Sequence, residues 1–246
     1  MEPGSNTLLT DLIAKNLEAV RKKIDAAAQK ADRDPALIKL VVVTKRRPLE
    51  VVRAAMACGV QCFGENYPEE GAEKSIALGD HREIEWHMIG HVQSRKANLV
   101  CDHYQFLHSL DSLKLAYHLE SHLAGINRVL PVLLEVNISG EESKHGFLAD
   151  ALEKWDQLIP EMEEISQLPH LKIAGLMTMP PLFEDPENVR PIYKKISVLR
   201  QFLLDKLPHL NLKDLSMGTS ADYPIAVEEG ATILRVGEAI LGPRSR

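Results

Sequence analysis

Residues 40–45 have the sequence Leu-Val-Val-Val-Thr-Lys. A run of aliphatic and β-branched residues, with Pro48 soon after it, is typical of a strand that is buried on both faces in a parallel sheet. Lys45 then stands at the carboxyl end of the strand, which is where ligands bind in open α/β sheets and in α/β barrels. The alternative is that Lys45, with Arg46 and Arg47 after it, only begins a solvated basic loop.

The rest of the chain alternates between short apolar runs and longer segments of helical periodicity. An amphipathic helix is expected first, over about residues 8–27. Further strands are expected at 60–63, 84–89, 104–108, 129–136, 171–176, 212–216 and 233–235. Helices are expected at 49–58, 68–78, 92–100, 111–124, 148–168 with a break near Pro160, 189–207 and 221–229, with a final turn at 239–241.

Strict alternation of strands and helices predicts parallel strands joined by right-handed crossovers, and eight such units close into a barrel. We therefore expect an α/β fold, a single (β/α)8 TIM barrel with an added N-terminal helix, and one domain over residues 1–246. The length agrees with the roughly 250 residues of a typical barrel. A doubly wound open sheet is the alternative, because the strands at 60–63 and 212–216 are short.

Composition narrows the class of protein. The chain is 45% hydrophobic and 26% charged, as in ordinary globular proteins, and its net charge of -6 argues against nucleic-acid partners. Cys58, Cys62 and Cys101 show no Cys-x-x-Cys spacing, which favours reduced thiols in a cytoplasmic protein. We expect no signal peptide, no membrane-spanning helix and no membrane partner.

Two segments that follow the last two barrel strands could bind a phosphate group. Residues 216–220, Ser-Met-Gly-Thr-Ser, offer hydroxyl groups and a glycine just before a helix amino terminus. Residues 235–237, Arg-Val-Gly, add a second glycine corner and a cation. The alternative is a pair of ordinary turns in which Ser220 or Thr219 caps a helix. No histidine and carboxylate set has obvious metal-ligand spacing, so no metal site is expected.

A strand-end lysine and a phosphate site at one end of a barrel together suggest a ligand that is both an aldehyde and a phosphate. Pyridoxal phosphate has both groups, and a neutral lysine amine forms a Schiff base with its aldehyde. Arg235 could reach the ring nitrogen, where an arginine keeps that nitrogen unprotonated and makes the ring a weaker electron sink.

Several motifs resemble those of a known family. They are Trp-His-Met-Ile-Gly-His-Val-Gln-Ser-Arg-Lys at 86–96, Phe-Gly-Glu-Asn-Tyr at 63–67, Glu-Val-Asn-Ile at 135–138 and Gly-Leu-Met at 175–177. The chain is similar to the YggS/PROSC group, the pyridoxal phosphate homeostasis proteins, over roughly residues 8–242. These proteins resemble the barrel domain of alanine racemase without its second domain.

The resemblance implies no catalytic residue and seven cofactor-binding residues: Lys45 as the aldimine lysine, Ser220 and Gly237 at the phosphate, Arg235 at the ring nitrogen, and Asn66, His87 and Met217 around the ring. For His87, a core or ring-stacking role is favoured over an acid or base. The chain departs from the family pattern in Arg46 and Arg47 after the lysine, and in Thr219 before the phosphate serine with Asp222-Tyr223-Pro224 after it. Pro224 suits the first turn of a helix, so the phosphate site should survive.

The resemblance further implies a cytoplasmic, monomeric protein that binds pyridoxal phosphate and carries or buffers it for PLP-dependent apoenzymes. The alternative is a racemase-like enzyme. Racemisation by this fold needs a second base on the opposite face of the cofactor, which alanine racemase takes from a partner's second domain. A regulatory binding partner is a third possibility that the sequence neither supports nor excludes.

Overall fold

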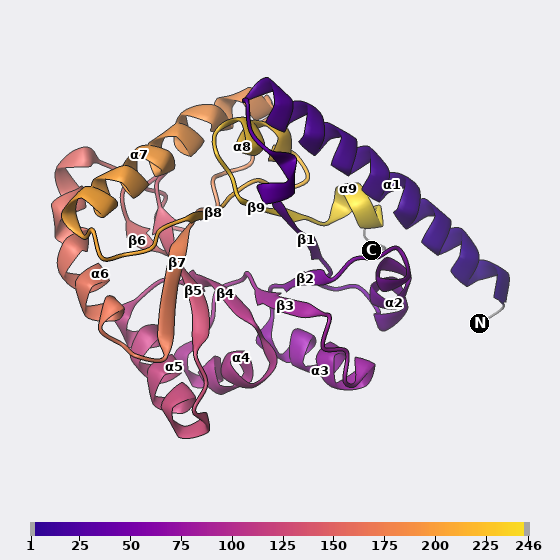
Figure 1. Cartoon of the computed structure of the whole chain (residues 1–246), viewed down its shortest axis with the longest axis horizontal. Coiled ribbons are helices and arrows are strands. Elements are labelled where there is room, and N and C mark those ends of the chain that lie inside the picture. The colour runs from indigo at the N-terminus through magenta and orange to yellow at the C-terminus, as the bar shows by residue number, and fades with distance from the viewer. Residues whose placement is uncertain (1–2, 244–246) are drawn as a thin grey trace.

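Eight parallel strands form a closed barrel in the computed structural model, which describes residues 3–243 (Figure 1). Their order around the ring is β1, β2, β3, β4, β5, β7, β8 and β9, and the ring closes because β9 pairs with β1 and β4 pairs with β5. The strands are β1 Lys39–Val43, β2 Cys62–Glu65, β3 Glu85–Met88, β4 Phe106–Leu110, β5 Leu130–Asn137, β7 Leu171–Met177, β8 Asp214–Ser216 and β9 Ile233–Val236, with a short β6, Phe147–Leu148, beside the end of β5. The predicted TIM barrel is confirmed, and the open sheet is excluded.

Helices surround the barrel on its outer side (Figure 1). They are α1 Pro3–Lys30, α2 Leu49–Ala57, α3 Pro68–Leu78, α4 Ala97–His103, α5 Leu113–Ile126, α6 Ile159–Ser166, α7 Arg190–Lys206, α8 Tyr223–Glu228 and α9 Glu238–Leu241. The expected helix at 68–78 is confirmed at both ends, since Pro68 starts α3 and Gly79 ends it in a positive-φ conformation. Within residues 3–243, no helix combines the length and apolar character needed to cross a membrane.

The expected helix at 148–168 is wrong in its first half. Residues 147–148 form β6, and a 3-10 segment, Leu152–Leu158, precedes α6. Pro160 lies in the first turn of α6, where its missing N–H removes no hydrogen bond, so it begins a helix rather than kinking one. The expected helix at 92–100 is displaced along the chain, because a 3-10 turn, Ser94–Lys96, comes before α4.

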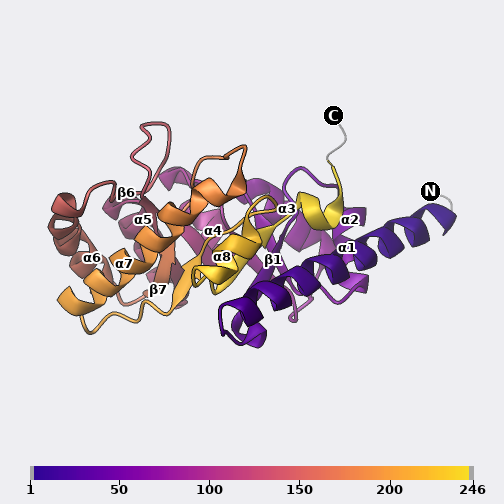
Figure 2. The same ribbon diagram turned by 90° about the horizontal axis from the view of Figure 1, so that it is seen from above.

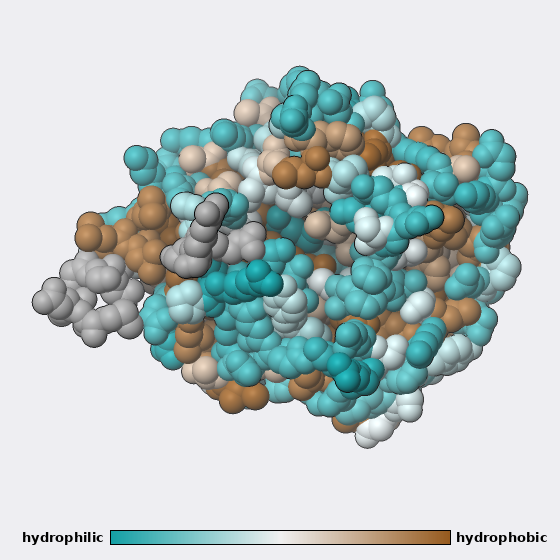
Figure 3. Space-filling view, turned by 180° about the vertical axis from the view of Figure 1, so that it is seen from behind, coloured by the Kyte–Doolittle hydropathy of each residue, from teal (hydrophilic) through white to brown (hydrophobic). Residues whose placement is uncertain are grey.

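Helix α1 spans the seam where the last strand meets the first. It packs on α2, α8 and α9, and its amino-terminal end projects beyond the barrel (Figure 2). The Asn16 side chain donates to the carbonyl of Ile240 at 3.0 Å, and Lys30 pairs with Glu228 at 2.8 Å. Leu8 is exposed. Figure 3 shows the molecule from behind, with a mainly hydrophilic surface interrupted by separate apolar areas.

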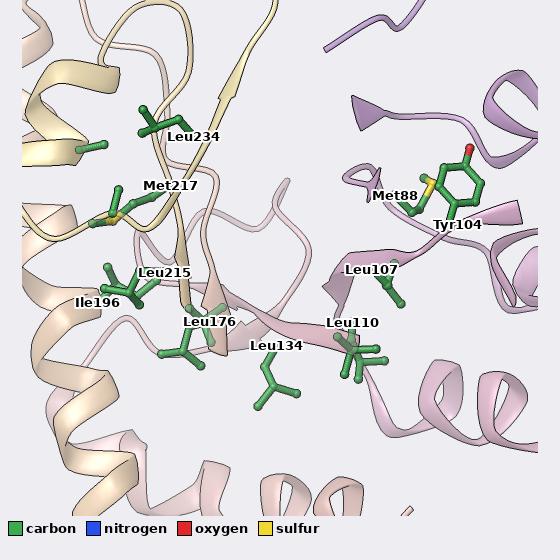
Figure 4. Close-up of a cluster of buried hydrophobic side chains, with 14 of the residues drawn as sticks. Met88, Tyr104, Leu107, Leu110, Leu134, Leu176, Ile196, Leu215, Met217 and Leu234 are labelled. Carbon is green, nitrogen blue, oxygen red and sulfur yellow. The ribbon is translucent and has the colours of Figure 1, made fainter. Parts of the chain in front are cut away.

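The main apolar core lies between the strands and the helices, where Leu107, Leu134, Leu176 and Leu215 are fully buried (Figure 4). A second apolar cluster is formed by Val41, Leu133, Ala174, Met177 and Ile233. Side chains along a strand point alternately to the two faces of the sheet. The residues next to each member of this small cluster in the chain therefore face the helices.

Candidate functional site

A pocket of about 300 Å³ opens at the carboxyl ends of the strands, the end that we call the barrel mouth. Five of the seven predicted site residues line it: Lys45, Asn66, Ser220, Arg235 and Gly237. They follow or end strands β1, β2, β8 and β9, so residues that are far apart in the chain meet because the barrel closes. Strand β1 ends at Val43, and Lys45 therefore lies two residues beyond the strand.

Buried polar residues fix the backbone beside Lys45. The Thr44 hydroxyl donates to Oε1 of Glu65 at 2.6 Å. The ammonium group of Lys74, on α3, donates to the Thr44 carbonyl and to Oε1 of Glu65, at 2.7 Å in each case. It also reaches Oε1 of Glu70 at 2.7 Å. The strand end that carries Lys45 is thereby tied to both β2 and α3.

Glu65 precedes α3, but it is not an exposed charge at the amino terminus of that helix. It ends strand β2 and is fully buried. Burial raises the pKa of Glu65 to about 7, although Lys74 and Thr44 act in the opposite direction. Its Oε2 atom has no hydrogen-bond partner among the described residues.

Ser220 and Gly237 meet at one wall of the pocket. The Ser220 hydroxyl oxygen accepts from the backbone N–H groups of Gly237 and Ala239, at 3.2 and 3.1 Å. A Cβ atom on Gly237 would lie 3.0 Å from the carbonyl oxygen of Val43, so only glycine lets the two segments approach this closely. A hydroxyl group beside converging N–H groups is an arrangement suited to a phosphate oxygen.

The residues around Ser220 that depart from the family pattern form hydrogen bonds that anchor their loop. One carboxylate oxygen of Asp222 accepts from the N–H of Thr219 at 2.6 Å and from its hydroxyl at 3.0 Å. The other accepts from the Tyr193 hydroxyl at 2.9 Å. Pro224 lies in the first turn of α8, as expected. The loop that carries Ser220 is therefore well anchored.

Arg235 is a buried cation in the pocket wall, with 3% of its surface exposed. One terminal nitrogen donates to the Ser216 hydroxyl, and the other donates to the carbonyl of Thr178 at 2.9 Å. Burial lowers the pKa of Arg235, but a guanidinium keeps its charge at neutral pH. The pocket therefore has one positively charged wall.

His87 and Met217 do not line this pocket. His87 is fully buried, with its Nδ1 atom 2.8 Å from Nε2 of His108, and it stacks on the Phe106 ring at a centroid distance of 5.3 Å. Met217 is fully buried in the apolar core, near Leu234 in Figure 4. In this structure both residues are therefore buried outside the pocket lining.

The two arginines after Lys45 have different positions. Arg47 lines the pocket and donates to the carbonyls of Gly242 and Pro243, the latter at 2.9 Å. Arg46 has a φ of 57° and places its guanidinium 3.0 Å from the Tyr67 hydroxyl. Arg47 is thus a pocket residue that sequence reasoning missed. Its partners lie at the other end of the chain, where no local pattern could have revealed them.

The model of the alanine racemase N-terminal domain family matches residues 15–245. The chain belongs to this family. A pyridoxal phosphate homeostasis protein of Pseudomonas aeruginosa is 41% identical over 235 residues, which cover 94% of this chain and 96% of that protein. The protein of the same name from Escherichia coli is 36% identical over 236 residues, covering 94% of this chain and 97% of that protein. Within the alanine racemase N-terminal domain family, the chain is a member of the pyridoxal phosphate homeostasis group.

Solved structures show the same barrel. PipY of Synechococcus elongatus, in a structure with PLP bound, has a TM-score of 0.81 and 31% identity, covering 94% of this chain and 100% of that chain. Alanine racemase from Corynebacterium glutamicum has a TM-score of 0.65 and 18% identity, covering 96% of this chain and 62% of that chain. The second likeness concerns the fold alone.

Proposed function

We propose that this protein binds pyridoxal phosphate at the barrel mouth, holds it as a Schiff base on Lys45, and stores or delivers it in the cytoplasm. The observation that carries the proposal is that Lys45 and the turn formed by Ser220 and Gly237 line one pocket. Relatives named for pyridoxal phosphate homeostasis, and the PLP-bound structure of PipY, support it.

Each part of the ligand has a chemical counterpart in the pocket. The Lys45 amine would join the aldehyde, and the Ser220 hydroxyl with the Gly237 N–H would receive the phosphate. The Oδ1 atom of Asn66 is buried without a hydrogen-bond partner among the described residues, which leaves an acceptor for a ligand. Bound pyridoxal phosphate supplies an electron-withdrawing ring. Arg235 would donate a hydrogen bond to the ring nitrogen without transferring its proton, so the electron withdrawal by the ring would stay weak.

The experiment for Schiff-base formation uses the absorption spectrum and the mass of the protein. We expect an aldimine band after addition of pyridoxal phosphate, and after borohydride reduction a stable mass increase on a peptide that contains Lys45. Lys45→Ala should abolish both. Lys172→Ala is the control, because Lys172 is an exposed lysine on β7. A band that survives in Lys45→Ala would contradict the proposal.

The storage role can be separated from catalysis. Among the described residues that line the pocket there is no histidine, tyrosine or cysteine to act as a second base, and Glu238 is exposed. We therefore expect no conversion of an L-amino acid into its D enantiomer beyond that produced by free pyridoxal phosphate. The protein loaded with pyridoxal phosphate should restore activity to a PLP-dependent apoenzyme. We propose that it does so as a monomer with a single domain. Racemisation at a catalytic rate would favour a racemase-like enzyme.

A further inference from the structure

A chain of hydrogen bonds crosses the barrel from Arg235 to the opposite end. Arg235 donates to the Ser216 hydroxyl, which lies 2.8 Å from Nδ1 of His108. Nε2 of His108 lies 2.8 Å from Nδ1 of His87, and Nε2 of His87 lies 3.3 Å from Oε2 of Glu85. Ser216, His108 and His87 are fully buried, whereas the Glu85 side chain is 46% exposed at the start of β3. Four strands contribute to this chain.

When both imidazoles are neutral, the carboxylate end fixes the direction of every bond. A guanidinium can only donate and a carboxylate can only accept, whereas a hydroxyl and a neutral imidazole each do both. Nε2 of His87 must carry a proton to face the carboxylate, so Nδ1 of His87 accepts from His108, and Nδ1 of His108 in turn accepts from the Ser216 hydroxyl. Nε2–H of His108 donates to His87, and Nε2–H of His87 donates to Glu85. In the reverse arrangement, the lone pair on Nε2 of His87 would face the carboxylate.

The surroundings favour the charge states that this direction needs. Burial lowers the pKa of His87 and, more strongly, that of His108, so both rings are neutral. At the exposed end, the bond from His87 and the Lys39 ammonium group 2.6 Å away hold the pKa of Glu85 at about 2. The Cys62 thiol also donates to this carboxylate, at 3.6 Å. Glu85 is therefore a permanent acceptor.

We propose that Ser216, His108, His87 and Glu85 form a polarised chain that positions the Arg235 guanidinium against the ring nitrogen of the cofactor. Glu85 fixes the direction of the chain from the far end of the barrel. These are positioning residues, because they act through Arg235. The proposal rests on the proposed function, since it assumes that a pyridine ring lies beside Arg235.

The first test needs no ligand. In protein labelled with ¹⁵N-histidine, at neutral pH, His87 and His108 should each give the spectrum of a neutral imidazole protonated at Nε2. Signals are identified by their loss in His87→Gln and His108→Gln. A proton on Nδ1 of either ring, or a doubly protonated ring, would overturn the proposal.

The second test compares pyridoxal phosphate with its 1-deaza analogue, which has a carbon in place of the ring nitrogen. Ser216→Ala should weaken binding of pyridoxal phosphate by about tenfold, the size of one hydrogen bond to a charged group, and leave binding of the analogue unchanged. Glu85→Gln, which can donate as well as accept, should act in the same direction. Its side chain is half exposed, so it leaves no buried cavity.

Phe106→Leu is the matched control, because Phe106 contacts both histidine rings without joining the chain. It should change the affinity for the two ligands equally. If Ser216→Ala weakens the binding of both ligands equally, the chain has only a structural role and the proposal is overturned. If the wild-type protein binds neither ligand, the proposed function is wrong, and the role of the chain at the ring nitrogen is wrong with it. The imidazole spectra test the direction of the chain independently of that result.

Discussion

The ammonium group of Lys74 lies 2.7 Å from the backbone carbonyl oxygen of Thr44. Thr44 immediately precedes Lys45, so a buried cation on α3 holds the segment that presents the proposed Schiff-base lysine. The side chain of Lys74 is 8% exposed, and that of its partner Glu65 is not exposed at all. Removing one member of such a pair leaves an uncompensated buried group.

Lys74→Met should lower the free energy of unfolding by about 1–3 kcal/mol, because the buried Thr44 carbonyl loses its donor. Glu65, whose pKa is already raised to about 7, takes up a proton instead of remaining an unpaired charge. Urea unfolding of the protein without cofactor measures this change. Lys96→Met is the control, since the ion pair of Lys96 with Glu69 is partly exposed and should contribute less than about 1 kcal/mol. Equal losses in the two variants would show that the buried network does not stabilise the strand end.

Ser220→Ala should weaken the binding of pyridoxal phosphate by about tenfold, because one hydrogen bond to a charged phosphate is lost. The binding of pyridoxal, which has no phosphate, should not change. Titration of the absorption spectrum with each ligand gives both affinities. A similar loss for pyridoxal would place the phosphate elsewhere in the pocket.

The protein should lose stability as the pH rises from about 4.5 to about 7, in part because of Glu135. Burial and the charge of Asp111 raise the pKa of Glu135 from 4.5 to about 7. Between these values the carboxyl is protonated in the folded protein and ionised in the unfolded chain. Its contribution to stability is therefore fully present below about pH 4.5 and is lost as the pH rises through 7.

Glu135→Gln removes this titration and should gain stability relative to the wild type, by roughly 1–3 kcal/mol, between about pH 5 and pH 8. Urea midpoints at the two pH values measure the difference. Glu184→Gln, at an exposed site, should give the same difference from the wild type at both values. A Glu135→Gln effect that does not depend on pH would contradict the assignment.

Local patterns in the sequence were enough to predict the barrel. The run at 40–45 and the helix at 68–78 carry their own burial pattern and end signals, so they could be located without tertiary information. The segment at 148–158 could not, because its apolar residues suit a helix, whereas β6 pairs with the end of β5. That pairing depends on contacts that only the closed barrel supplies.

The candidate site divides in the same way. Lys45 ends the predicted strand stretch at 40–45, and Ser220 lies in the segment after the predicted strand at 212–216. The barrel places ligand-binding residues at these positions, and both line the pocket. Arg235 and His87 were predicted as site residues, but nothing in the sequence indicated the path that joins them through His108 and continues to Glu85. The members of this path come from four strands and meet only in the folded barrel. His108 and Glu85, taken alone, resemble ordinary strand residues.

The position of α1 across the seam of the barrel has a consequence for biosynthesis. Helix α1 packs on α8 and α9, which the ribosome makes long after α1. Its apolar side chains, including Ile13 and Leu17, lack their final cover until residue 241 has emerged. Part of the apolar face of α1 therefore stays exposed on the nascent chain until α8 and α9 have been made.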